Sequence, residues 1–112
     1  MMKMIIQFDK DKAQATGYEY DNLIKFMDAL FERNFCIKET NNDESMVYSN
    51  SNLSDNHMRD FACIYMVLSE SKWFADTCSK WIWLDNDDDE TLPFVEEDVL
   101  IKERKRNPLF AM

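Results

Sequence analysis

The spacing of apolar residues changes within the first 34 residues, and this change most constrains the fold. In Lys3–Phe8, apolar side chains occupy alternate positions, which predicts an opening β-strand. Residues 20–34 instead place apolar side chains three and four positions apart, and Asp21 stands where a helix would be capped. This stripe consists of Leu23, Ile24, Met27, Leu30 and Phe31. A strand followed by an amphipathic helix predicts a domain that packs helices on a sheet.

The middle of the chain adds a hairpin and a further helix. Residues 35–39 and 45–49 are short strand-like runs, and the polar segment 40–44 between them is typical of a turn. Ser54 or Asp55 then stands before a helix that we expect over about residues 56–69. A buried strand over Phe61–Leu68 is the alternative for this apolar run.

Two helices are expected in the last third of the chain. Residues 72–84 place large apolar side chains on two neighbouring helical rows, and residues 93–106 have acids near the start and bases near the end. The predicted fold class is α+β, with a small antiparallel or mixed sheet of about three strands covered by three to four helices. Residues 1–106 are expected to form a single compact α+β domain, and residues 107–112 a short C-terminal tail.

The net charge of −9 is unevenly distributed. Residues 1–101 hold 21 acids and 9 bases, whereas residues 102–112 hold 1 acid and 4 bases. Such a negative surface repels nucleic acids and anionic membranes and attracts basic proteins or metal ions. Direct DNA binding and membrane association are therefore not expected.

Residues 84–98 carry eight carboxylates and no lysine or arginine. The acids are Asp85, Asp87, Asp88, Asp89, Glu90, Glu96, Glu97 and Asp98. Three interpretations are open: a cation site, a solvated loop, and a surface that imitates the phosphates of a nucleic acid. Helices are expected on both sides of this segment. Carboxylates three or four residues apart would then lie next to one another on the helical turns at a helix–loop–helix corner.

The calcium interpretation depends on a partial match to an EF-hand loop that begins at Asp85. Acids stand at the first, third and fifth positions, and Glu96 stands at the twelfth. Glu90 occupies the sixth position, where the backbone turns sharply and glycine is required, and Pro93 is unusual at the ninth. A solvated acidic loop is therefore favoured over specific calcium binding.

Motifs for catalysis are absent from the sequence. The single histidine, His57, lies near an expected helix start, and the single glycine, Gly17, leaves no phosphate-binding loop. The three cysteines are odd in number and widely spaced, which favours free thiols over disulfides or a zinc site. We therefore expect no enzymatic activity, no metal and no cofactor. The apolar runs are too short to span a bilayer, so the expected location is the cytoplasm.

Small size, acidity, scarcity of glycine and abundant aromatic residues together resemble the phage and mobile-element inhibitors known as anti-CRISPR and anti-restriction proteins. The resemblance implies an inhibitor of DNA-mimic type that acts in a bacterial host cell, and whose partner is a basic nucleic-acid-binding protein such as a nuclease complex. The predicted partner-binding residues are the eight acids of residues 84–98 and Trp83.

Two other functions stay open. The first is a general interaction or homodimerisation module that uses exposed aromatic residues, for which Trp83 and Phe110 are the candidates. The second is a regulator that binds a divalent cation through residues 85–96. The sequence does not decide whether the basic end of the chain contacts the partner.

Overall fold

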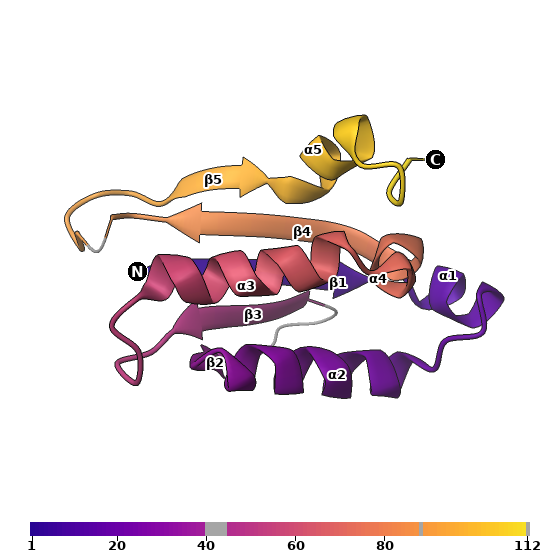
Figure 1. Cartoon of the computed structure of the whole chain (residues 1–112), viewed down its shortest axis with the longest axis horizontal. Coiled ribbons are helices and arrows are strands. Elements are labelled where there is room, and N and C mark those ends of the chain that lie inside the picture. Colours follow the sequence, from indigo (N-terminus) through magenta and orange to yellow (C-terminus); the bar gives the residue numbers. More distant parts are fainter. Residues whose placement is uncertain (40–44, 88, 112) are drawn as a thin grey trace.

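The computed structural model describes residues 1–39, 45–87 and 89–111. Five strands and five helices occur within these ranges (Figure 1). In chain order they are β1 (Met2–Phe8), α1 (Lys10–Ala15), α2 (Tyr20–Arg33), β2 (Cys36–Lys38), β3 (Ser45–Asn50), α3 (His57–Ser69), α4 (Lys72–Thr77), β4 (Cys78–Asp85), β5 (Val95–Asp98) and α5 (Val99–Arg106). The described residues contain no helix with the length and apolar character that crossing a membrane requires.

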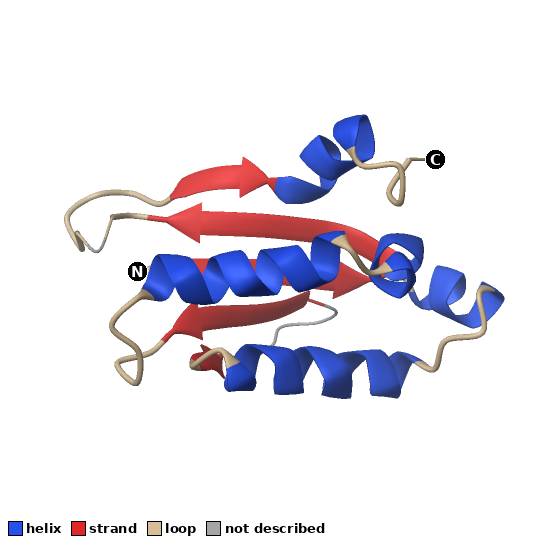
Figure 2. Cartoon of the chain, in the orientation of Figure 1, coloured by secondary structure: helices blue, strands red, loops and turns tan. Residues whose placement is uncertain are grey.

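The strands form one antiparallel sheet in the order β2-β3-β1-β4-β5 (Figure 2). In the first four strands, β3 separates β1 from β2, and β1 separates β3 from β4. This is the split β-α-β arrangement called ferredoxin-like, to which β5 and α5 are added. Such an arrangement hosts many unrelated functions, so function has to be argued from the surface of this chain.

Both long helices cover the same face of the sheet. Met4 pairs with Tyr48 on one side and with Trp83 on the other, so these three side chains share a face. The Phe31 ring of α2 stacks on Tyr48 at 3.9 Å between centroids, and the Phe61 ring of α3 stacks on Trp83 at 5.8 Å. The core therefore lies between this face and the helices; Figures 1 and 2 show α3 lying across the sheet.

The expectation of about three strands and three to four helices is wrong. The predicted helix over residues 72–84 ends at Thr77, and the chain continues as β4. Trp81 fits a helical row with Trp73 but also alternates with Trp83, and aromatic and β-branched residues favour strands. Pairing with β1 decides between the two periods, because as a strand the segment aligns from Met2↔Asp85 to Phe8↔Cys78.

The predicted helix over residues 93–106 is also wrong in its first half. Val95–Asp98 form β5, and the helix begins only at Val99, capped by the Asp98 side chain. The sequence analysis did not predict the short helix α1; it is capped by the side chain of Asp9, which accepts hydrogen bonds from the backbone N–H groups of Asp11 and Lys12. The opening strand, the helix over residues 20–34 and the helix over residues 56–69 are confirmed. The hairpin strands pair as predicted, while their turn, residues 40–44, lies outside the described residues.

The end of the chain packs on the domain through Phe110. This side chain is 3% exposed, and its ring lies 6.3 Å from Phe74 and 6.0 Å from Trp81 between centroids. Trp81 is itself completely buried and also stacks on Tyr65. A residue beyond α5 thus completes the aromatic core around Trp81 of β4.

We expect Phe110→Ala to lower the free energy of unfolding by about 3 kcal/mol, because it removes a buried ring and leaves a cavity beside Trp81. Leu109→Ala is the matched control: Leu109 is 40% exposed, and its loss should change stability by less than about 0.5 kcal/mol. Urea unfolding followed by tryptophan fluorescence measures both variants. Equal stability of the two would show that residues beyond α5 do not contribute to the core.

A buried carboxylate joins α5 to α3. Glu103 is 2% exposed and accepts hydrogen bonds from the Tyr65 hydroxyl, from Asn107 at 2.9 Å and from Arg106 at 3.0 Å. Asn107 also donates to the carbonyl of Ser69 at 2.8 Å. Burial alone would raise the pKa of Glu103, but these hydrogen bonds and the Arg106 charge outweigh it, and the pKa lies below its ordinary value.

Stability should depend on pH through this group. Because the folded-state pKa is below the ordinary value of 4.5, ionised Glu103 stabilises the fold at pH values above 4.5. That contribution is lost as the pH falls through the folded-state pKa. Glu103→Gln should be less stable at pH 7 and should lose less stability between pH 4.5 and about pH 3 than the parent chain. Denaturant unfolding across this range, with exposed Glu32→Gln as control, measures the effect; an unchanged pH slope in Glu103→Gln would contradict it.

Candidate functional site

The acids of residues 84–98 lie on a β-hairpin at the edge of the sheet. We call residues 82–98 the acidic hairpin; it consists of most of β4, the connecting residues 86–94, and β5. The strand pairs are Ile82↔Asp98, Trp83↔Glu97, Leu84↔Glu96 and Asp85↔Val95. β5 is the edge strand, and all four of its residues are exposed.

The predicted helix–loop–helix corner is wrong, because strands and not helices flank the connecting residues. Side chains alternate between the two faces of a strand, and directly paired residues share a face. Glu97 therefore lies on the face with Trp83, which is the face that α3 covers, while Glu96 and Asp98 lie on the opposite face. The acids surround the edge of the sheet instead of forming rows along helical turns.

Two aspartates shape the connecting residues. Asp85 Oδ1 accepts a hydrogen bond from the backbone N–H of Asp87 at 2.8 Å, and Asp87 has a positive φ of 56°. Short polar side chains are among the few that tolerate this left-handed conformation. Asp89 Oδ1 accepts from the hydroxyl of Thr91 at 2.6 Å and from its backbone N–H at 2.9 Å, and these hydrogen bonds hold the pKa of Asp89 below its ordinary value.

Two further acids interact with α5. Glu97 Oε1 lies 2.8 Å from Lys102 Nζ, and Asp98 Oδ1 accepts a hydrogen bond from the backbone N–H of Ile101 at 3.1 Å. The second interaction caps the helix, and a negative charge there also suits the helix dipole. Glu97 is thus partly neutralised, and Asp98 has a structural role.

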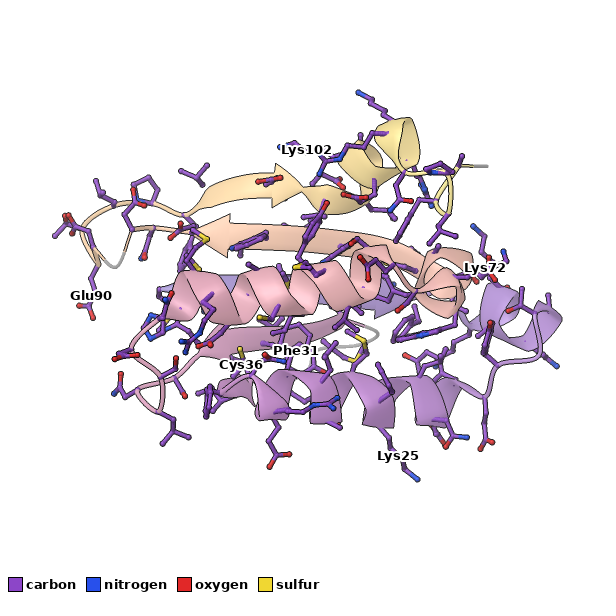
Figure 3. The ribbon with its side chains drawn as sticks, viewed as in Figure 1. Lys25, Phe31, Cys36, Lys72, Glu90 and Lys102 are labelled. Carbon is purple, nitrogen blue, oxygen red and sulfur yellow. The ribbon has the colours of Figure 1, made fainter. Side chains whose placement is uncertain are left out.

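The remaining charge of the acidic hairpin faces solvent. Asp87, Glu90 and Glu96 are exposed, and within the described residues none of them forms an ion pair. In Figure 3 Glu90 projects from the far end of the connecting residues. This end lies at one extreme of a molecule 42 Å long, whereas α5, with its exposed Arg104 and Lys105, follows the opposite end of β5 (Figure 1). Glu90 and α5 are therefore at opposite ends of the hairpin, while Glu97 pairs with Lys102.

A cleft of about 430 Å³ opens on the helix-covered face beside β5. Its lining combines carboxylates with apolar side chains: Met58, Trp83, Asp85, Asp87, Val95 and Glu97. Trp83 is half-buried and packs on Phe61, whereas Val95 is 71% exposed. The cleft arises because β5 extends the sheet beyond the part that the helices cover.

The structure brings together part of the predicted site and adds residues to it. Trp83, Asp85, Asp87 and Glu97 line the cleft, and Glu90, Glu96 and Asp98 lie elsewhere on the hairpin. Asp88 lies outside the described residues. Met58 and Lys102 were missed because their contribution depends on how α3 and α5 pack beside the hairpin. Phe110, a candidate for an exposed anchor, is instead buried in the core.

The EF-hand comparison does not hold, because such a loop joins two helices and residues 85–96 join two strands. Among the described residues, no three His, Cys, Asp or Glu side chains form a group able to hold a metal ion. His57 Nε2 lies 3.1 Å from the carbonyl oxygens of both Ser51 and Ser54, so the imidazole stabilises the loop before α3. Cys36 and Cys78 are buried, and burial raises the pKa of each thiol to about 12.

Comparison with known proteins gives no relative: no family model, no curated protein and no solved structure matches this chain.

The structural role of Asp98 can be separated from its charge. Asp98→Asn keeps a side-chain oxygen for the helix cap and should change stability by only a few tenths of a kcal/mol. Asp98→Ala removes the cap and should lower the free energy of unfolding by about 1 kcal/mol. Thermal unfolding of the two variants measures the difference, and equal melting temperatures would argue against the cap.

Proposed function

We propose that this protein is a non-enzymatic inhibitor that binds a basic, nucleic-acid-handling protein through the acidic hairpin. A CRISPR effector or a restriction enzyme, in the cytoplasm of a bacterial host cell, is the kind of partner that fits. The observation that carries the proposal is the group of exposed carboxylates of Asp87, Glu90 and Glu96 on one projecting hairpin, which form no ion pair with any other described residue. Glu90 lies at the end of the hairpin that is furthest from α5.

The physical basis is electrostatic complementarity. A groove that binds nucleic acid presents lysine and arginine side chains arranged for phosphates. An acidic projection attracts such a groove at a distance, accelerates association and competes with the nucleic acid for the same bases. Because the interacting charges are exposed, salt should weaken the complex strongly.

The test is a charge reversal with a matched control. The hairpin variant carries Glu90→Lys, Glu96→Lys and Glu97→Lys, which leaves in place the aspartates that accept backbone hydrogen bonds. The control variant carries Glu32→Lys, Asp55→Lys and Glu70→Lys, which are exposed positions outside the hairpin with the same total change of charge. Each immobilised protein is incubated with a bacterial lysate, and bound proteins are released with salt and, separately, with duplex DNA.

We expect the parent chain and the control variant to retain nucleic-acid-binding proteins that both salt and duplex DNA release. The hairpin variant should retain at least tenfold less, because each exposed pair contributes up to about 1 kcal/mol and three pairs are reversed. Equal retention by both variants would refute the role of the hairpin. Retention that DNA does not reduce would refute competition with nucleic acid.

A second candidate is homodimerisation or partner docking through the outer side of α3. Cys63, Met66 and Val67 lie three and four residues apart on this helix and are exposed, Met66 at 57%. Such a contact would be insensitive to salt. Analytical ultracentrifugation over a range of protein concentrations, with Met66→Glu as the disrupting variant, tests this candidate. A monomer at all concentrations would exclude homodimerisation.

A further inference from the structure

The cleft beside β5 has a composition that negative charge alone does not explain. Three apolar side chains and three carboxylates line a space of about 430 Å³. We propose that the cleft receives an arginine side chain of the basic partner; this inference rests on the proposed function and names the group that the hairpin recognises. An arginine combines an apolar stem with a planar cationic head, and the cleft offers a surface for each.

Strand pairing places these two kinds of surface side by side. Trp83 stands directly opposite Glu97, and Asp85 stands directly opposite Val95 on the same face. Directly paired side chains have Cβ atoms about 4.5–5.5 Å apart, so each carboxylate has an apolar neighbour within reach of one side chain. Met58, from the first turn of α3, completes the apolar lining. A bound stem would contact Met58 and Val95, while the guanidinium group would stack on the indole and donate to the carboxylates.

The lining favours a guanidinium group over other cations. A calcium ion requires six to eight oxygen ligands, and the indole and thioether side chains supply none. A lysine ammonium group is compact and strongly hydrated, whereas a guanidinium group is weakly hydrated, planar and able to form two parallel hydrogen bonds with a carboxylate. The Trp83 ring is held in place by its contact with Phe61, so the aromatic wall is formed before a ligand arrives.

An internal cation already pairs with one carboxylate of the cleft lining. Lys102 Nζ lies 2.8 Å from Glu97 Oε1, and the lysine side chain is 55% exposed. An entering guanidinium group therefore competes with Lys102 for Glu97. Removing Lys102 should strengthen binding of an arginine side chain beyond the effect of removing one positive charge elsewhere.

Lys102→Gln and Lys105→Gln form a matched pair for this test. Both change the net charge by the same amount from exposed positions of α5, and only Lys102 contacts a residue of the cleft. The probe is the peptide acetyl-Gly-Arg-Gly-amide, titrated into the full-length ¹⁵N-labelled protein at low salt. Chemical shifts of the Trp83 indole N–H and the Val95 amide report binding, and the corresponding lysine peptide is the ligand control.

We expect Lys102→Gln to bind the arginine peptide about two- to fivefold more tightly than Lys105→Gln, which is the size of one exposed ion-pair interaction. The double variant Asp85→Asn, Glu97→Gln should bind about tenfold more weakly than the parent; the first of these substitutions retains the side-chain oxygen that accepts from the backbone N–H of Asp87. The lysine peptide should bind more weakly than the arginine peptide. The NMR spectrum of each variant shows directly whether it is folded.

Three results would overturn the inference: equal affinity of the two glutamine variants, shifts that map away from Trp83 and Val95, or no binding of the peptide to any variant. These failures differ from failure of the proposed function. If charge reversal on the hairpin abolishes retention of basic proteins while the peptide does not bind, the acidic hairpin remains the recognition surface and the cleft is not an arginine site. If charge reversal has no effect, the proposed function itself fails.

Discussion

The pairing of β4 with β1 is the interaction on which the rest of the structure depends. β1 lies at the centre of the sheet and buries Met4, Ile6 and Phe8 on the helix-covered face. The register that aligns Met4 with Trp83 turns Trp81 and Trp83 towards α3. A shift of one residue would turn both indoles to the other face. The same register fixes where β4 ends and therefore where the acidic residues leave the sheet.

This pairing also explains which parts of the fold can be predicted from the sequence. The helix over Tyr20–Arg33 follows from local spacing, because four side chains on one stripe are buried against the sheet. The segment from Lys72 to Asp85 is different, since Trp73 and Trp81 fit a helical row while Trp81 and Trp83 fit an alternating strand. Its two halves adopt different structures, α4 and β4, and only the long-range partner strand selects the second. β5 is harder still to predict from the sequence. Its four residues are all exposed and three of them are acidic, so they show no alternation of apolar and polar side chains.

The acidic cluster was visible in the sequence, but its geometry was not. Acids on an edge strand have a role that is independent of any partner, since charge there prevents unpaired backbone groups from recruiting another strand. This role accounts for Glu96 and Glu97 without invoking recognition. It does not account for Asp87 and Glu90, which lie beyond the paired residues, or for the cleft in which Asp85 and Asp87 meet Trp83. Edge protection and recognition therefore concern partly different residues of one hairpin.

The length of an acidic side chain is related to whether its carboxylate accepts a local backbone hydrogen bond or stays free in solvent. Aspartate places its carboxylate close enough to accept from a backbone N–H two or three residues further on, and Asp85, Asp89 and Asp98 all do so. Glutamate is one methylene longer, and Glu90 and Glu96 form no such local hydrogen bond among the described residues. Asp85, Asp89 and Asp98 accordingly stabilise the turn and the helix start, while Glu90 and Glu96 hold their charge away from the backbone. Some of the carboxylates are thus engaged in local hydrogen bonds of the fold. The other, exposed carboxylates are the ones that a cationic surface can reach.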